Sequence, residues 1–266
     1  MLMTKNRRVR IAAGTLETAN LLFFKLLLHN RAAARLYPGL AFRQFVYLKQ
    51  GERWRSGSIF DFMPELRTAP VRITLEHLPG EGLATPINEL ALMAIVTKAL
   101  EPAHVFEIGT FRGRTALNFA LNSPAGCQIF TLDLPKEALV EETVAAHANR
   151  ADATLIEARR VGLDYDGKDV SSKITQLYGD SRTFDFEPYA SRMDLVFVDG
   201  GHTYDVVTSD TEKALKMCRP GGIIMWHDFA NYGDYHDVTR AVMDIVGGEI
   251  FQLEDSQLAA YRVPRR

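Results

Sequence analysis

From residue 104 onward, short apolar runs alternate with amphipathic helical patterns, and this alternation constrains the fold more than any other feature of the sequence. Apolar runs of strand length occur at 104–109, 128–133, 174–179, 193–199 and 222–228. Apolar residues at helical spacing predict helices over 85–100, 114–121, 136–150, 203–217 and 235–246. Apolar strands separated by helices are typical of a parallel sheet covered on both faces. The sequence therefore predicts an α/β fold with a doubly wound, mostly parallel sheet.

Two further strands are predicted near the C-terminus, over 249–254 and 258–263, and a tight turn joins them. They bring the predicted sheet to seven strands and give it an antiparallel edge. We assign 85–266 to this domain and 1–84 to a helical N-terminal extension, in which 69–82 is predicted as a strand followed by a turn. The polar segment 157–173 is long for a connection, so we predict that it is a functional loop.

Positive charge is concentrated in the N-terminal arm. Residues 1–55 hold eleven Lys and Arg and two Glu, a net +9, while the other 211 residues hold 20 Lys and Arg and 31 Asp and Glu, a net −11. The apolar run LLFFKLLL at 21–28 is much shorter than the roughly 20 apolar residues that span a bilayer. Two interpretations stay open. The arm packs on protein, as a lid or in a homodimer interface, or it lies on a membrane surface.

The cysteines indicate a reducing environment. Cys127 and Cys218 are too few for a disulfide framework, and their spacing matches no zinc site. The short apolar run of the arm is also a poor signal peptide, because no small-residue cleavage site follows it. We therefore expect a cytoplasmic protein, with a membrane-peripheral position as the alternative that the basic arm allows.

An acid ends or follows each of the five central strands. These acids are Glu107, Asp133, Asp180, Asp199 and Asp228. Ligands of open parallel sheets bind at the carboxyl ends of the strands, so these side chains are expected to share one site. A ring of carboxylates repels phosphate and suits a ligand that carries a positive charge and several hydrogen-bond donors.

The turn after the first strand also argues against a dinucleotide. A dinucleotide fingerprint needs glycines at the first, third and sixth positions, but Phe111 and Arg114 occupy the third and sixth positions counted from Gly109. S-adenosylmethionine fits the carboxylates better, because it combines an ammonium group, a sulfonium, a ribose diol and an adenine amine.

Five motifs then carry a resemblance to a known family. EIGTFRG, TLDLP, QLYGDS, DLVFVDGGHTYD and RPGGIIMWHDF occur in this order. Together they resemble the class I S-adenosylmethionine-dependent methyltransferases, and within these a bacterial small-molecule group related to the catechol O-methyltransferase type. The resemblance covers residues 85–263 and implies a Rossmann-like fold and methyl transfer from S-adenosylmethionine.

The resemblance also implies roles for single residues. Glu107 and Gly109 would flank the methionine part of the cofactor, Gly113 would complete the turn, and Asp133 would accept hydrogen bonds from both ribose hydroxyls. Asp180 and Ser181 would meet the adenine edge. The full set of expected cofactor-binding residues is Glu107, Gly109, Thr110, Phe111, Gly113, Asp133, Leu134, Gly179, Asp180, Ser181, Asp199 and Gly200.

Catalysis is expected at the ends of the fourth and fifth strands. His202 follows two glycines and is the candidate general base, and Asp199 would lie under the reacting end of the cofactor. Asp199 and Asp228 match the carboxylates that hold Mg²⁺ in catechol-type relatives. Phe229 stands where those relatives have an amide ligand, which argues against the metal. For His202, a loop or cap role and metal ligation stay open as alternatives.

The predicted function is methyl transfer from S-adenosylmethionine to a small-molecule acceptor, most naturally a hydroxyl of a sugar or secondary metabolite. An alternative is a regulatory protein of the same fold that binds the cofactor without turnover. A nucleic-acid substrate is not expected, because the body is acidic and has no basic stretch with interleaved aromatic residues.

Overall fold

The structure, a computed structural model, describes residues 54–76, 85–135, 160–231 and 235–265. The chain divides into two compact units, Met1–Glu52 and Arg53–Arg266. The first unit lies outside the described residues, and so does the predicted helix 136–150. The membrane contact and the homodimer, which we based on the N-terminal arm, therefore stay predictions. The second unit begins earlier in the chain than the boundary we placed after residue 84.

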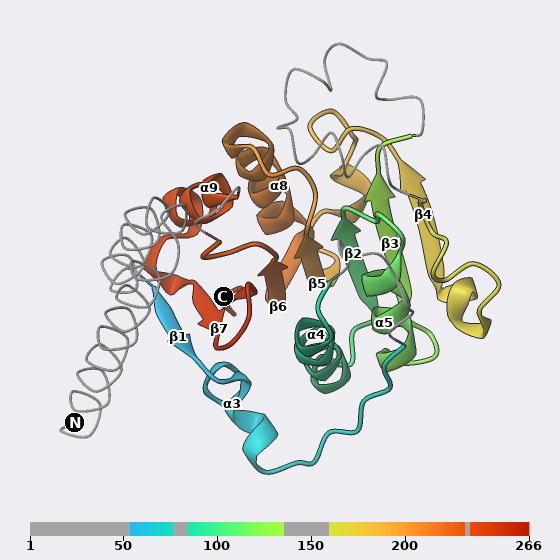
Figure 1. The fold of residues 1–266 in the computed structure, drawn as a ribbon, viewed down its shortest axis with the longest axis horizontal. Helices are drawn as coiled ribbons and strands as arrows, with labels where there is room; N and C mark the ends of the chain where they lie inside the picture. The colour runs from blue at the N-terminus through green and yellow to red at the C-terminus, as the bar shows by residue number, and fades with distance from the viewer. Residues whose placement is uncertain (1–53, 77–84, 136–159, 232–234, 266) are drawn as a thin grey trace, which may run out of the picture. The chain divides into compact units, whose positions relative to one another are not determined.

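One sheet organises the second unit (Figure 1), and the predicted Rossmann-like α/β fold is confirmed. Its strand order is β1-β7-β8-β6-β5-β2-β3-β4. All neighbouring strands are parallel except β8, which runs antiparallel to both β6 and β7. The strands are β1 (Arg55–Gly57), β2 (His104–Ile108), β3 (Gln128–Asp133), β4 (Ile174–Tyr178), β5 (Met193–Val198), β6 (Cys218–Trp226), β7 (Phe251–Leu253) and β8 (Ala259–Arg262).

The sheet has one strand more than the seven we predicted. The additional strand is β1, whose three residues pair in parallel with β7. It comes from the segment that we assigned to the N-terminal extension. A strand of three residues carries too little periodic pattern to be recognised from sequence.

Helices cover both faces of the sheet. The described helices of at least nine residues are α4 (Ile87–Leu100), α5 (Arg114–Asn122), α8 (Tyr204–Met217) and α9 (His236–Val246). Alternate residues of β5 enter different cores: Val196 and Val198 pack in the cluster that contains residues of α8 and α9, while Leu195 and Phe197 pack in the cluster with residues of α4 and α5. This period of two explains why the central strands are apolar throughout.

The prediction of a strand within 69–82 is wrong for the part that the structure describes. Residues 69–76 have no regular secondary structure, and 77–84 lie outside the described residues. The backbone of Thr74 and Glu76 instead pairs with the side-chain amides of Asn122 and Asn118, both on α5. Side-chain amides thus satisfy the backbone groups that a neighbouring strand would otherwise satisfy.

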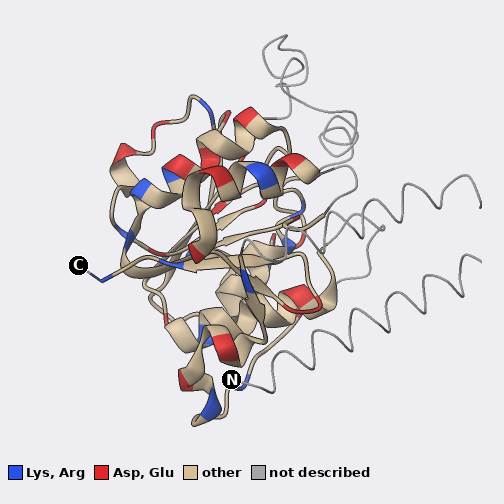
Figure 2. Cartoon of the chain, turned by 90° about the vertical axis from the view of Figure 1, so that its left-hand side faces the viewer, with Lys and Arg blue, Asp and Glu red and all other residues tan. Residues whose placement is uncertain are grey.

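Charges of both signs are interspersed over the outer helices on the face seen in Figure 2. Within the described ranges, no helix combines the length and the apolar character needed to cross a membrane.

Candidate active site

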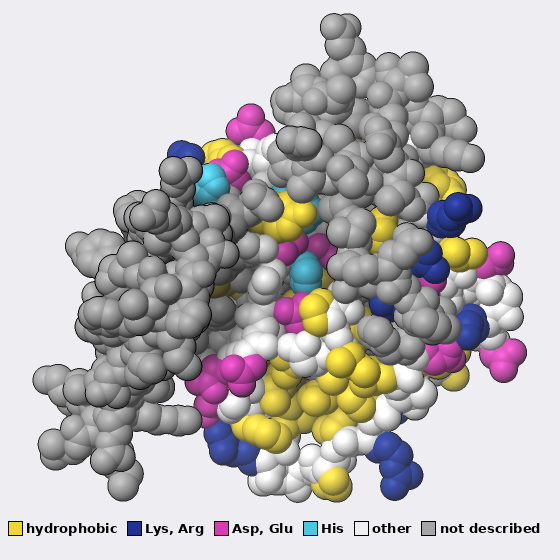
Figure 3. Space-filling model, viewed as in Figure 1, with side chains coloured by type: hydrophobic (Ala, Val, Ile, Leu, Met, Phe, Trp, Pro, Cys, Tyr) yellow, Lys and Arg dark blue, Asp and Glu magenta, His cyan; other side chains and the backbone are white. Residues whose placement is uncertain are grey.

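The carboxyl ends of β2 to β6 meet at one edge of the sheet, where all the predicted site residues lie. Histidine and acidic side chains gather near the middle of the face shown in Figure 3, next to an apolar area. The site has two halves: the ends of β2, β3 and β4, and the ends of β5 and β6.

Two glycines of the turn after β2 are required by their surroundings. Gly109 has a φ of +101°, and a Cβ placed on it would lie 1.8 Å from the carbonyl oxygen of Asp199. Gly113 has a φ of +82°, and a Cβ there would lie 2.5 Å from the ring of Tyr165. Both positions therefore exclude a side chain on conformational and on steric grounds. The turn passes close to β5 at one glycine and to the 160–168 loop at the other.

The carboxylate of Asp133 is oriented by the backbone around it. The N–H of Phe111 donates to Asp133 Oδ2 and the N–H of Leu134 donates to Oδ1, both at 2.7 Å. Phe111 reaches this position with a φ of +49°, which is uncommon for a non-glycine residue. Each carboxylate oxygen can accept a second hydrogen bond, so the arrangement is suited to a pair of neighbouring hydroxyls.

A directed chain of hydrogen bonds ends at Glu107. The hydroxyl of Tyr165 donates to Gln176 Oε1 at 2.6 Å, and Gln176 Nε2 donates to Thr110 Oγ1 at 3.1 Å. The hydroxyls of Thr110 and Thr131 are 2.6 Å apart, and Thr131 Oγ1 donates to Glu107 Oε2 at 2.5 Å. Because Thr131 donates to Glu107, the Thr110 hydroxyl is the donor to Thr131.

Glu107 is nevertheless disposed to bind a proton. Burial raises its pKa well above the ordinary value, against the hydrogen bond from Thr131, and the carboxylates of Asp199 and Asp133 raise the pKa further. Glu107 is 1 % exposed. Desolvation therefore outweighs the hydrogen bond at the end of β2.

The loop that we predicted to be functional supports the turn after β2. The backbone N–H of Asp164 donates to the carbonyl of Arg112 at 2.8 Å, and the Asp164 carboxylate pairs with the side chains of Arg112 and Arg114. Asp164 is 2 % exposed, so this pairing is buried. Asp164 and Tyr165 together hold residues 110–114 in place. A functional role of this loop beyond this support stays a prediction.

The loop after β4 is fixed by its own charges and by α8. The carboxylate of Asp180 accepts hydrogen bonds from the Arg182 side chain, at 2.5 Å from Nη2, and from the Arg182 backbone at 2.9 Å. The side chain of Lys213 on α8 donates to the carbonyl of Ser181. A Cβ on Gly179 would lie 3.0 Å from the ring of Phe184. Asp180 thus shapes the loop, and its carboxylate is already occupied by Arg182.

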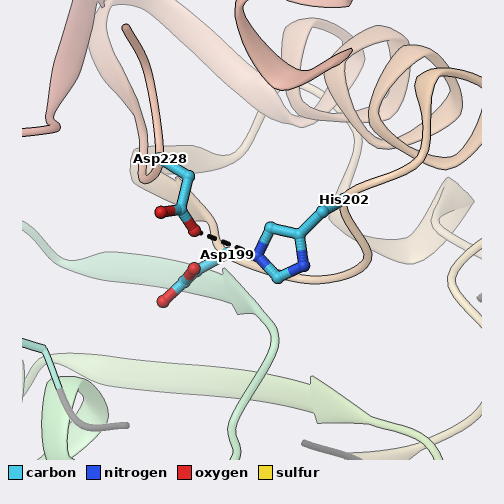
Figure 4. Close-up of side chains that lie close together, drawn as sticks. All are labelled: Asp199, His202 and Asp228. Atoms are coloured by element: carbon cyan, nitrogen blue, oxygen red, sulfur yellow. Dashed lines mark ion pairs between the residues drawn. The ribbon is translucent and has the colours of Figure 1, made fainter. Parts of the chain in front are cut away.

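The second half of the site is a cluster of acids and imidazoles. Asp199, His202 and Asp228 each offer a ligand atom, and these atoms lie within 4.8 Å of one another (Figure 4). His202 Nε2 is 3.0 Å from Asp228 Oδ2, and the ring of His202 stacks on Tyr235 with 4.1 Å between the centroids. Asp228 has a φ of +54°, in the left-handed region that Asp adopts more readily than most non-glycine residues. The structure therefore brings together the three residues that the sequence predicted for this half.

His227 joins this cluster from the end of β6, and our sequence analysis gave it no role. Its Nδ1 lies 3.3 Å from Asp199 Oδ1 and 3.1 Å from Asp228 Oδ2, and its Nε2 lies 2.7 Å from Glu89 Oε2. Burial alone would lower the pKa of His227, but the three carboxylates outweigh burial and raise it well above the ordinary value. Burial would likewise raise the pKa of Asp228, but hydrogen bonds from His202 and His227 hold it well below its usual range.

Glu89 was missed because it lies in the apolar helix α4, far from the strand-end motifs in sequence. It is 3 % exposed, and its Oε1 accepts a hydrogen bond from the backbone N–H of Gln257 at 2.7 Å. A single acid within the apolar segment INELALMAIV was a signal that could have identified it.

Phe229 packs in the core of the protein, as its apolar side chain suggests. It is fully buried, and its ring lies 5.0 Å from that of Trp54. An amide nevertheless reaches Asp228, because Asn231 Nδ2 donates to Asp228 Oδ1 at 3.2 Å. The amide thus comes from a position two residues beyond the one that we considered.

Comparisons with known proteins agree with the fold. Residues 106–229 match the family model described as a methyltransferase domain. The cofactor-bound structure of Rv0187 from MTB is 17 % identical with a TM-score of 0.50, covering 70 % of this chain and 84 % of that chain. The O-methyltransferase TomG from Streptomyces achromogenes, in complex with SAM, is 18 % identical with a TM-score of 0.45 and coverages of 82 % and 95 %.

The SAH-bound methyltransferase PaMTH1 from Podospora anserina is 15 % identical with a TM-score of 0.48, covering 84 % of this chain and 95 % of that chain. No curated protein matches the sequence. Because the family match runs from within β2 to the residue after Asp228, the five strand-end acids lie within it, whereas Glu89 does not. Residues 106–229 match a methyltransferase domain, and the likeness to a solved structure shows the fold, both in agreement with the class that the motifs predicted.

Proposed function

We propose that this protein is an S-adenosylmethionine-dependent methyltransferase that transfers the methyl group to a hydroxyl oxygen of a small molecule. The observation that carries the proposal is the His202–Asp228 pair beside Asp199, at the edge of the sheet that holds the cofactor motifs. A hydroxyl acceptor must lose its proton during transfer, and an imidazole oriented by a carboxylate is suited to accept it. A sugar or a secondary metabolite is the acceptor class that we favour.

The cofactor in this proposal lies across the ends of β2, β3 and β4. Its ribose diol binds Asp133, because both oxygens of this carboxylate are already oriented by backbone N–H groups. The methionine part lies against the turn Gly109–Gly113 and near Glu107, and the adenine lies at Gly179, Asp180 and Ser181. Thr110 positions Glu107 through Thr131. Gly200 borders the adenine, because the loop after β5 turns at this residue.

The chemical step is an in-line displacement at the methyl carbon. The acceptor oxygen forms the new bond to this carbon as the carbon–sulfur bond breaks, and the bonding electron pair stays on sulfur to give the neutral thioether S-adenosylhomocysteine. The hydroxyl proton passes to His202, and Asp228 stabilises the imidazolium that forms. Alignment of the three reacting atoms supplies most of the remaining rate enhancement.

A divalent cation is compatible with the same cluster. Asp199, Asp228 and His202 would hold it, and this mixed set of carboxylates and imidazole suits Mn²⁺ or Zn²⁺ better than Mg²⁺, which prefers oxygen ligands. When bound, such an ion would polarise the acceptor oxygen. In that case His202 would act as a ligand. Activity that survives a chelator would instead leave His202 as the base.

The test measures turnover of S-adenosylmethionine with a panel of hydroxylated small molecules, together with the affinity for S-adenosylhomocysteine. We expect His202→Ala to lower turnover by about 10²- to 10⁴-fold, the usual contribution of a general base, while the affinity stays within about twofold. His236→Ala is the matched control, because the His236 side chain is 64 % exposed. Unchanged turnover in His202→Ala would contradict the proposal.

A further inference from the structure

A row of three polar residues crosses three neighbouring strands of the sheet. Glu107 on β2 is paired in register with Thr131 on β3, and Thr131 is paired in turn with Gln176 on β4. Paired residues of parallel strands point to the same face of the sheet, so the three side chains lie next to one another. Glu107 and Thr131 are buried. Buried polar groups cost folding free energy unless they are hydrogen-bonded, so the bonds within this row decide what the row can do.

The amide group of Gln176 is held in one orientation. Its Nε2 donates to the carbonyl oxygens of Thr131 and Leu177, at 3.1 and 2.8 Å. Carbonyl oxygens only accept hydrogen bonds, so the nitrogen of the amide, and not its oxygen, must face them. Gln176 Oε1 therefore faces the Tyr165 hydroxyl, which donates to it at 2.6 Å.

This orientation sets the direction of the hydrogen bonds between Gln176 and Glu107. Gln176 Nε2 also lies 3.1 Å from Thr110 Oγ1, and an amide nitrogen cannot accept a proton from that hydroxyl. The Thr110 hydroxyl therefore donates to Thr131, and Thr131 donates to Glu107 Oε2. In the reverse direction, a protonated Glu107 Oε2 would donate to Thr131 and Thr131 to Thr110. The Thr110 proton would then have no acceptor among the described residues.

We propose that Gln176 is a positioning residue that holds Glu107 Oε2 as a hydrogen-bond acceptor, so that the site favours a ligand with an ammonium group. A carboxylate that accepts from Thr131 keeps its negative charge, and in buried surroundings this charge attracts a nearby cation more strongly than it would in water. The α-ammonium group of the methionine part of the cofactor is such a cation. The proposal rests on the proposed function, in which the methionine part lies near Glu107.

The experiment compares the affinities of two ligands for the full chain by calorimetric titration. S-adenosylhomocysteine carries the α-amino acid group, and 5′-methylthioadenosine lacks it. Gln176→Met keeps the side chain at about the same length but cannot direct the Thr110 hydroxyl. We expect this variant to bind S-adenosylhomocysteine about 3- to 10-fold more weakly, as expected for one hydrogen bond, and 5′-methylthioadenosine within about twofold of the wild type. If Gln176→Met does not fold, Gln176→Asn, which withdraws the amide by one methylene, replaces it in the same titrations.

A double-mutant cycle with Thr131→Val tests whether Gln176 acts through the chain. Thr131→Val removes the hydroxyl that donates to Glu107, so it should weaken the binding of S-adenosylhomocysteine as Gln176→Met does. Once Thr131 cannot donate, adding Gln176→Met should weaken this binding by less than about a further twofold. Gln128→Met is the matched control, because Gln128 is an exposed residue at the start of β3, and it should bind both ligands as the wild type does.

Three results would overturn the inference and leave the proposed function intact. Unchanged binding of S-adenosylhomocysteine by Gln176→Met would show that the amide does not act on Glu107. Equal weakening of both ligands would show that Gln176 only supports the fold of the site. Additive losses in the double variant would show that Gln176 does not act through Thr131. If the wild type binds neither ligand, the proposed cofactor site fails together with this inference.

Discussion

Two buried acids at the same edge of the sheet have pKa values shifted in opposite directions. Burial raises the pKa of Glu107 at the end of β2, whereas hydrogen bonds to His202 and His227 lower the pKa of Asp228 just after β6. Glu107 is 1 % and Asp228 6 % exposed, so burial does not explain the difference. Their partners do, because Glu107 accepts from a threonine hydroxyl and Asp228 from two imidazoles.

The comparison separates an acid with neutral hydrogen-bond partners, Glu107, from an acid with ionisable partners, Asp228. Around Glu107, hydroxyl and amide groups form a directed chain that holds a shape and carries little charge. Around Asp228, carboxylates and imidazoles lie within about hydrogen-bond distance of one another, which suits proton transfer. In the proposed function, the first half binds the cofactor and the second acts on the acceptor.

The largest expected effect on the unfolding free energy concerns a third buried acid, Asp210 on α8, which extends the comparison. Its pKa is raised from 3.8 to about 7, which corresponds to about 4 kcal/mol of unfolding free energy. Because the folded-state pKa is the higher one, the stabilisation relative to Asp210→Asn is fully present below about pH 4 and is lost as the pH rises through about 7. Urea unfolding of the wild type and Asp210→Asn at several pH values measures this difference in unfolding free energy. A difference that does not vary with pH would contradict the raised pKa of Asp210.

A direct test replaces each acid of the compared pair with its amide. Asp228→Asn should cost about 3 kcal/mol of unfolding free energy at pH 7, because it removes the anion between two buried imidazoles. Glu107→Gln should cost less than about 1 kcal/mol, because an amide oxygen can still accept from Thr131. Denaturant melts measure both, and equal costs would show that the two halves do not differ as described.

A smaller effect tests the directed chain of hydrogen bonds that ends at Glu107. Thr131→Val keeps the shape but removes the hydroxyl that joins Thr110 to Glu107, at an expected cost of about 1–2 kcal/mol. Thr175→Val, on the neighbouring strand β4 at an exposed position, is the control and should change the unfolding free energy by less than about 0.5 kcal/mol. If both substitutions change the unfolding free energy equally, the chain of hydrogen bonds does not stabilise the protein as described.

The sheet and the strand-end acids were predictable because both follow from local patterns. Apolar runs identified β2 to β6, and the five acids follow from where those runs end. β1 escaped prediction because it has three residues. The strand predicted within 69–82 was wrong because the backbone of Thr74 and Glu76 pairs with Asn122 and Asn118 rather than with a strand.

The partners of the acids were not predictable in the same way. Glu89 reaches His227 across 138 positions of sequence, and nothing near either residue signals the contact. Asp210 did leave a signal, because it falls at helical spacing on the face of α8 that also carries Val206, Val207 and Ala214. An acid on an apolar face is worth examining as a site residue.

The most direct test of the account is calorimetric titration of S-adenosylhomocysteine into the wild type and Asp133→Ala. We expect micromolar binding by the wild type, and an affinity weaker by about 1–3 kcal/mol in the variant, because the alanine cannot accept from the ribose diol. Asp169→Ala, a substitution in the η3 segment (Asp169–Lys173), is the control and should bind as the wild type. Equal affinities of the wild type and Asp133→Ala, or no binding by the wild type, would contradict the account.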